Sequence, residues 1–161
     1  MFCAQKDNAW GPAHEIGHIQ QKAINWPSCT ESSNNLFSNL TLYKLGKYCS
    51  RGRSLDKLAR ARFEDGNSWF NLGEGFESAY QGEAPDLHLR MHWQLFNYYH
   101  RCGYMTDFWP KMFKALRETR IVESDPGAAQ MLFARTACEV ANEDLTDFFE
   151  MWGFFVPVNN K

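Results

Sequence analysis

The sequence predicts a mainly helical, bundle-like protein with little or no sheet. Apolar residues recur three and four positions apart in most segments, which is the spacing of one face of an α-helix. The alternation of apolar and polar residues that is typical of a half-buried strand is nearly absent. Because 161 residues with 44% hydrophobic side chains can bury one sizeable core, we expect a single helical domain over residues 1–161.

Two helices are expected near the N-terminus. Pro12 fits the first turn of a helix, where its missing N–H has no intrahelical partner to lose. The first helix should therefore run from Gly11 to about Ile24. Thr30 can cap a second helix, which ends at Gly46.

The middle of the chain is less regular. Ser54 can cap a short helix that ends at Gly66. Residues 69–82 are ambiguous, because Gly73 and Gly75 weaken a helical pattern there. No repeat or low-complexity segment separates this part from the rest.

The strongest helical pattern covers residues 86–103, with Asp86 suited to the N-cap. Its apolar stripe consists of Leu87, Met91, Leu95 and Tyr98.

Three further helices are expected towards the C-terminus. The first has Thr106 as its cap and Pro110 in its first turn, and the second starts with the pair Asp125-Pro126. The last begins at Asp144 and ends near Gly153.

Composition and charge exclude several classes of function. A net charge of −2 does not suggest a nucleic-acid-binding protein. No apolar run approaches the ~18 residues of a membrane span, and the first ten residues lack the apolar core of a signal peptide. The five cysteines are scattered and contain no C-x-x-C pair, so neither a disulfide framework nor a cysteine zinc site is expected.

The first helix contains the pattern His14-Glu15-Ile16-Gly17-His18. Residues four apart share a helix face, so His14 and His18 can direct two imidazoles at one metal ion. Glu15 lies beside that face and can act as a general base on a water at the ion. The alternative is an ordinary amphipathic helix with incidental histidines.

A catalytic zinc needs a third protein ligand from another element. Glu31 stands at the start of the second helix, and an antiparallel pair of helices would bring it to the two histidines. Asn35 lies one turn further on the same face and could hydrogen-bond a ligand. The alternative for Glu31 is a first-turn carboxylate that only complements the helix dipole.

The segments WGPAHEIGHIQQ and INWPSCTESSNNLFS resemble the enhancin-like, mucin-degrading metallopeptidases, family sixty of the metallopeptidases. LRMHWQLFNYY and DLTDFFEMWGFF extend the resemblance over nearly the whole chain. The family's gluzincin-type pattern, H-E-x-x-H followed by a glutamate, matches His14, Glu15, His18 and Glu31. The resemblance implies one Zn²⁺ and an endopeptidase that cleaves glycoproteins such as mucins. It also implies secretion or a cell-surface location.

The chain departs from this family in one respect, because the family's catalytic domain has a segment before the H-E-x-x-H helix. We therefore expect the C-terminal lobe of a longer catalytic domain. The upstream lobe should complete the substrate cleft, and the chain alone should have little or no peptidase activity. The zinc-site helices should occupy about residues 10–46 and the helical remainder about residues 53–155.

Several aromatic and histidine side chains are candidates for contacts with the substrate. His88, His92, Tyr98 and Tyr99 lie on one expected helix and could stabilise the developing oxyanion, although packing is the more common role for such a tyrosine. His88 and His92 could also form a second metal pair, but no third ligand or general base accompanies them. Trp10 could stack on a sugar, or it could pack in the core.

Three kinds of function remain open at this point. The first is a zinc endopeptidase, and the second is a non-catalytic helical module that binds metal or glycoprotein. The third is a structural helical domain with accidental histidines. Glu15 argues against the second, since a binding module needs no general base, and the third predicts that no metal binds tightly.

Overall fold

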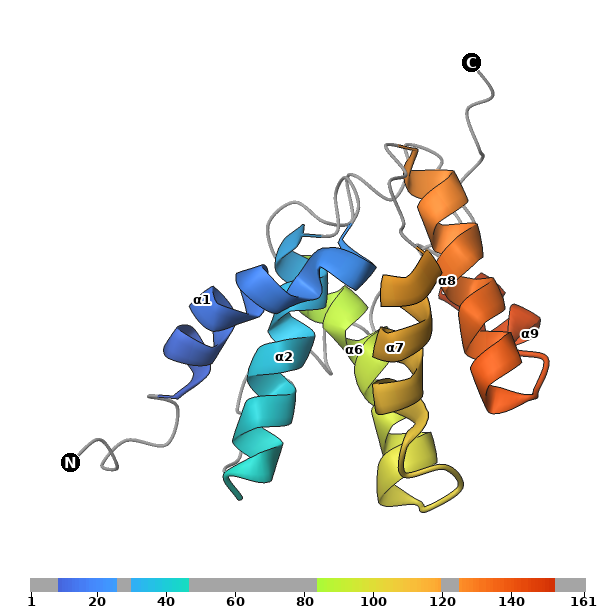
Figure 1. Ribbon diagram of the computed structural model, residues 1–161. Coiled ribbons are helices and arrows are strands. Elements are labelled where there is room, and N and C mark those ends of the chain that lie inside the picture. The colour runs from blue at the N-terminus through green and yellow to red at the C-terminus, as the bar shows by residue number, and fades with distance from the viewer. Residues whose placement is uncertain (1–8, 26–29, 47–83, 120–124, 153–161) are drawn as a thin grey trace, which may run out of the picture.

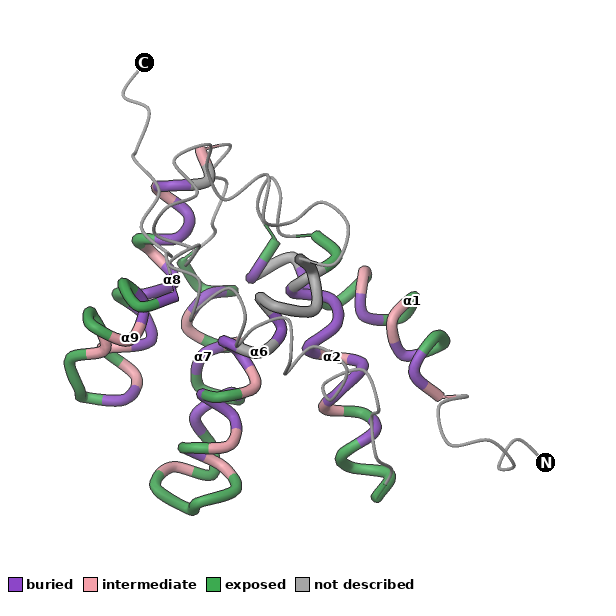
Figure 2. Tube along the Cα trace, turned by 180° about the vertical axis from the view of Figure 1, so that it is seen from behind, coloured by how far each residue is buried: buried purple, intermediate pink, exposed green. Residues whose placement is uncertain are grey.

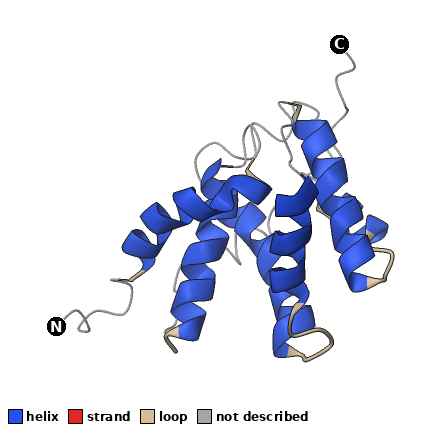
Figure 3. Ribbon diagram, in the orientation of Figure 1, coloured by secondary structure: helices blue, strands red, loops and turns tan. Residues whose placement is uncertain are grey.

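The computed structural model describes residues 9–25, 30–46, 84–119 and 125–152, and the arrangement of these segments is shown in Figure 1. All regular structure in these ranges is helical, and no strand occurs in them (Figure 3). The prediction of a mainly helical fold is thereby confirmed. The helix expected over residues 54–66 and the ambiguous segment 69–82 lie outside the described residues.

The helices follow the order that the sequence predicted. Two short elements continue the helices that precede them: η1 is a 3-10 turn, and η3 is a π-helical turn. The bounds are α1 (Trp10–Gln20), η1 (Gln21–Ile24), α2 (Thr30–Lys44), α6 (Ala84–Phe96), η3 (Asn97–Arg101), α7 (Phe108–Thr119), α8 (Pro126–Ala141) and α9 (Thr146–Met151).

The expected starts of the helices are partly correct. The Asp125 side chain accepts a hydrogen bond of 3.0 Å from the Ala128 N–H, so the predicted cap of α8 is confirmed. Asp86 was wrong as a cap, because α6 already begins at Ala84, one residue before a proline that fits a first turn. Thr106 was also wrong, because it lies in a turn before α7 begins.

Met91 and Leu95 of the expected apolar stripe are buried, and the Leu87 side chain lies outside the described residues. The stripe needs a correction at its C-terminal end. The π turn is closed by a 2.9 Å hydrogen bond from the Cys102 N–H to the Asn97 carbonyl, five residues back. A wider turn rotates the chain less per residue, so Tyr99 rather than Tyr98 continues the stripe of buried residues. Tyr98 is exposed as a result.

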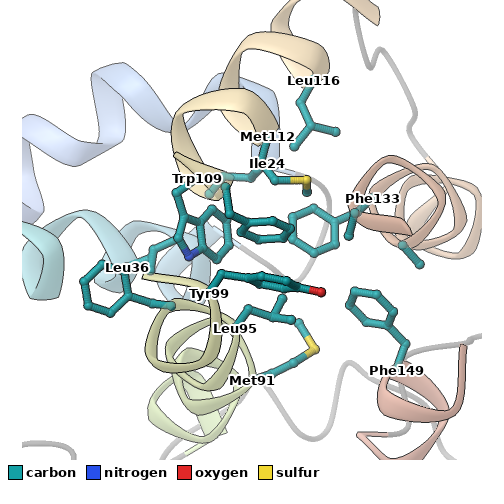
Figure 4. Packing of buried hydrophobic residues seen from close by; sticks show 14 of the residues in the cluster. Ile24, Leu36, Met91, Leu95, Tyr99, Trp109, Met112, Leu116, Phe133 and Phe149 are labelled. Carbon is teal, nitrogen blue, oxygen red and sulfur yellow. The ribbon is translucent and has the colours of Figure 1, made fainter. Parts of the chain in front are cut away.

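The hydrophobic core lies between α6, α7, α8 and α9 (Figure 4). Ile24 from η1 and Leu36 from α2 reach into the same cluster, which fixes these two elements to the core. Tyr99 and Phe108 stack in it with ring centroids 4.2 Å apart. Its largest completely buried side chains include Met91, Tyr99, Phe108, Met112, Leu116, Phe133 and Phe149.

Helix α1 lies at one edge of the molecule and packs on α2, outside this cluster (Figures 1 and 2). Its outer face is exposed, including Ile16 and Ile19. Its inner face approaches α2 at Gly17, where a Cβ atom would overlap the Asn34 side chain and come within 3.2 Å of Phe37 Cβ. Only a glycine allows this approach. None of the described helices has the length and apolar character needed to cross a membrane.

We expect Gly17→Ala to destabilise the α1–α2 contact by about 1–3 kcal/mol, because the added methyl group has no space. Gly11→Ala is the matched control, since a Cβ atom there meets nothing within 4 Å. The control should be neutral or stabilising by up to about 1 kcal/mol, because alanine favours a helix. Urea unfolding and hydrogen exchange of the α1 amides measure both variants, and equal behaviour of the two would contradict the packing argument.

Candidate metal centre

Three side chains converge where the N-terminal turn of α2 meets α1. His14 and His18 lie one turn apart on α1, and Glu31 lies in the first turn of α2. The His14 Nε2 atom is 3.1 Å from Glu31 Oε2, and the His18 Nε2 atom is 3.9 Å from Glu31 Oε1. One ligand atom from each residue lies within 4.8 Å of the other two. We call these three residues the candidate metal centre.

Two side chains hold the His14 ring, and a third holds the His14 backbone. The Nδ1 atom of the ring lies 3.0 Å from the Asn35 Oδ1 atom, so Asn35 contacts His14 as the sequence analysis expected. The Trp10 ring stacks on His14 with centroids 5.1 Å apart and planes at 20°. Trp10 in turn donates from Nε1 to Asn39 Oδ1 at 3.3 Å. The Asn34 side-chain amide donates to the His14 backbone carbonyl at 2.7 Å, which ties the α1 backbone at His14 to α2.

The His18 ring is held by a residue that the sequence analysis did not single out. The Nδ1 atom of His18 lies 2.6 Å from Gln21 Oε1, and the Gln21 side chain is completely buried. The same amide donates to the Thr30 carbonyl at 2.7 Å and to Ser33 Oγ at 2.9 Å. Gln21 stands three residues after His18 and therefore on the same helix face. This spacing was the signal in the sequence from which a contact between the two side chains could have been predicted.

This set of donor atoms fits a divalent metal ion. The Nδ1 atoms of both histidines are engaged by amide oxygens, so both Nε2 atoms are left facing the Glu31 carboxylate. Two imidazole nitrogens and one carboxylate oxygen are ligands that zinc prefers. The Glu31 and His18 side chains are 58% and 32% exposed, so solvent and a substrate can reach one side of the centre.

Glu15 follows His14 directly and is exposed on α1. Its position beside the ligand pair, on a rigid helix, is the one expected of a general base.

Of the other candidates whose side chains the structure describes, Trp10 contacts the candidate metal centre but is not open to a substrate, and the two tyrosines lie away from the centre. Trp10 is buried against His14, so its ring faces are not open for stacking on a sugar. Tyr98 and Tyr99 belong to η3, at the end of α6 remote from α1 (Figure 1). Tyr98 stacks on Tyr104, and the Tyr99 hydroxyl donates to Glu143 at 2.9 Å.

His92 is not open to solvent. It is completely buried, with Trp109 and Phe133 packed edge-on against its ring. Neither ring nitrogen has a hydrogen-bond partner in the described part of the chain, and burial lowers the pKa of His92 to about 3. The His88 side chain, and with it the second metal pair expected from His88 and His92, lies outside the described residues.

Comparison with known proteins gives three kinds of match. A sequence profile of the family described as "Peptidase M60, enhancin and enhancin-like" matches residues 2–153. A solved metallopeptidase from Bacteroides thetaiotaomicron is 57% identical, with a TM-score of 0.79. A solved metallopeptidase in complex with Tn antigen is 58% identical, with a TM-score of 0.80. TRPM8 channel-associated factor homologs from Danio rerio and Xenopus laevis are both 25% identical.

The matches cover almost all of this chain but only a part of each relative. The two structures align with 97% and 98% of this chain, which spans 26% and 29% of their own length. The two channel-associated factor homologs align with 98% and 93% of it, and the chain spans 17% and 16% of them.

Acid should destabilise the fold in part through His92. Its pKa is about 3 when folded and about 6.5 when unfolded, so the unfolded chain binds the extra proton between these values. Stability should therefore fall as the pH decreases from about 6.5 towards 3, by up to about 1.4 kcal/mol per pH unit.

His92→Leu should flatten this dependence in the metal-free protein, measured by urea unfolding at a series of pH values. His100→Leu, at the partly exposed end of the same helical segment, is the matched control and should retain it. A His92→Leu profile parallel to that of the unsubstituted protein would contradict the assignment.

Proposed function

Because this chain belongs to the peptidase M60, enhancin and enhancin-like family, as the sequence resemblance predicted, we propose that it supplies the zinc centre of an endopeptidase that cleaves glycoproteins. The observation that carries this proposal is the convergence of His14, His18 and Glu31, whose ligand atoms lie within 4.8 Å of one another. We propose that these residues bind one Zn²⁺.

Each residue has a distinct part in the proposed reaction. When bound, zinc supplies Lewis-acid chemistry, polarising the scissile carbonyl and lowering the pKa of a coordinated water to about 7. Glu15 accepts the proton of the attacking water and passes it to the leaving amine. Asn35 orients the His14 ring through the contact with Nδ1, so that Nε2 remains free for the ion.

The proposed substrate class is a glycoprotein such as a mucin. It is supported by the family and by the related metallopeptidase that was solved with Tn antigen, a glycan carried on glycoprotein. Such a substrate is consistent with an enzyme that is secreted or displayed on the cell surface, and we extend the proposal to that location.

We further propose that an upstream lobe of the same polypeptide completes the substrate cleft. The chain spans only 26% and 29% of the two related metallopeptidases. An extended peptide is commonly held by backbone hydrogen bonds to the edge of a sheet, and the described residues contain no strand. Positioning can supply about 7–11 kcal/mol of the reduction in the barrier, so this chain by itself should have little activity.

The alternative is a non-catalytic helical module that binds metal or glycoprotein. It is favoured by the two relatives that are named as channel-associated factor homologs rather than as peptidases. The two functions differ in the role of Glu15, since a binding module does not need a general base.

Metal analysis should find one zinc ion per chain. His14→Ala, His18→Ala and Glu31→Ala should each weaken zinc binding by more than the ~10–100-fold that is typical of residues that only support a ligand. Glu139→Gln, an exposed carboxylate on α8, is the control for a change of charge and should bind zinc normally. A zinc content near zero in the unsubstituted protein would rule out the proposed centre.

Glu15→Gln should retain zinc and lose peptidase activity by about 10²–10⁴-fold, because an amide cannot accept the proton of water. The assay measures cleavage of a mucin-type glycoprotein by a protein that includes the upstream lobe, with Glu150→Gln as the exposed control. Unchanged turnover would eliminate Glu15 as the base. Absence of cleavage by the unsubstituted protein would favour the binding module.

A further inference from the structure

Gln21 is a completely buried polar residue next to the candidate metal centre. A buried amide is destabilising unless its hydrogen-bonding groups have partners. Here the oxygen and the nitrogen are both engaged: Oε1 contacts His18 Nδ1, and Nε2 donates to the Thr30 carbonyl and to Ser33 Oγ. A residue whose whole amide is used in this way has a defined orientation.

The orientation of the Gln21 amide follows from its partners. A backbone carbonyl can only accept a hydrogen bond, so the group that faces the Thr30 carbonyl at 2.7 Å must be the NH₂ of Gln21. The oxygen of Gln21 must then face His18 Nδ1, at 2.6 Å. An amide oxygen also only accepts, so Nδ1 of His18 must carry the hydrogen.

The position of that hydrogen decides which nitrogen of His18 can bind a metal ion. A neutral imidazole has one N–H and one lone pair. With the hydrogen on Nδ1, the lone pair is on Nε2, the atom on the Glu31 side of the ring. Free imidazole side chains in water favour the opposite tautomer, with the hydrogen on Nε2. Gln21 therefore selects the minor tautomer before any ion arrives.

Gln21 also connects two ligands of the candidate metal centre. Thr30, whose carbonyl accepts from Gln21, directly precedes Glu31 in the chain, and Ser33 lies in the same first turn of α2. A single side chain thus sets both the ring of His18 and the backbone position of Glu31.

We propose that Gln21 is a positioning residue that fixes His18 as an Nε2 ligand and ties it to the helix that carries Glu31. The role rests on the proposed zinc centre. It extends that proposal, because Gln21 lies outside the H-E-x-x-H pattern and contacts no substrate or ion itself.

The first test requires no substitution. Nitrogen-15 NMR of histidine-labelled, zinc-free protein at about pH 8, where an ordinary histidine is neutral, distinguishes the two tautomers of His18. The structure predicts the Nδ1–H tautomer for His18. Predominance of the Nε2–H tautomer in the folded protein would overturn the role.

The second test compares variants of Gln21. Gln21→Leu has a similar volume but no hydrogen-bonding groups, so His18 should revert towards the Nε2–H tautomer. Zinc affinity should fall by about 10–100-fold, as for other residues that orient a metal ligand. Gln21→Glu retains an acceptor for His18 Nδ1 but places an oxygen against the Thr30 carbonyl. It should keep the Nδ1–H tautomer and bind zinc more tightly than Gln21→Leu does.

Two control variants separate positioning from a general loss of stability. Ser33→Ala removes one acceptor of the Gln21 amide and leaves the contact with His18, so the tautomer should not change. Thr136→Val removes a buried hydroxyl in α8, away from the centre, and should change neither the tautomer nor the affinity. Normal zinc affinity and the Nδ1–H tautomer in Gln21→Leu would overturn the role of Gln21.

The outcomes also distinguish this inference from the proposed function. If the unsubstituted protein fails to bind zinc, the proposed centre is wrong and Gln21 has no metal ligand to position. The NMR measurement on zinc-free protein then still decides whether Gln21 sets the tautomer of His18. If Gln21→Leu does not fold, the tautomer of the unsubstituted protein and the behaviour of Gln21→Glu decide it.

Discussion

The close approach of α1 to α2 at Gly17 is the constraint on which the rest of the site depends. Two of the three proposed ligands are on α1, whereas the third is on α2, so the distance between these helices sets the size of the candidate metal centre. Helix α1 contributes no residue to the large hydrophobic cluster. Its position is set instead by directed hydrogen bonds. Trp10 of α1 and Gln21 of η1 donate to α2, and Asn34 of α2 donates to the His14 carbonyl of α1. A hydrogen bond contributes only about 0.5–1.5 kcal/mol to stability, but it fixes direction in a way that apolar contacts do not.

The hydrophobic core contains none of the three proposed ligands, but it holds the elements on which they depend. Leu36 and Ile24 fix α2 and η1 to the cluster between α6, α7, α8 and α9, and α1 then rests on α2. The core thus fixes the position of α2, and α2 fixes the position of α1. The positions of the three proposed ligands depend on both contacts. Because both Nδ1 atoms are already engaged by amide oxygens, the two rings are oriented in the absence of an ion. A site arranged in this way loses little side-chain freedom when a metal binds.

The sequence predicted those features that depend on spacing along one helix or on local chemistry. The helical period, the Asp125 cap and the shared helix face of His14 and His18 are of this kind. The approach of Glu31 and Asn35 to these histidines was expected from an antiparallel pair of helices. The sequence did not predict the detailed packing between the helices. The burial of Trp10 against His14, the need for glycine at position 17 and the role of Gln21 all require knowledge of how α1 crosses α2. The π turn of η3 is a further case, because a uniform helical period places Tyr98 where the structure has Tyr99.

X-ray absorption at the zinc edge tests the central claim of this account most directly, because it reports the atoms bound to the metal in solution. The proposed centre should give a spectrum with two imidazole nitrogens and oxygen ligands at about 2.0–2.2 Å. The Glu31→Ala variant should lose the carboxylate contribution, and the Glu15→Gln variant should give an unchanged spectrum. Sulfur scattering at about 2.3 Å, the distance of a cysteine ligand, or a spectrum that the Glu31→Ala substitution leaves unaltered, would contradict the assignment of the metal to His14, His18 and Glu31.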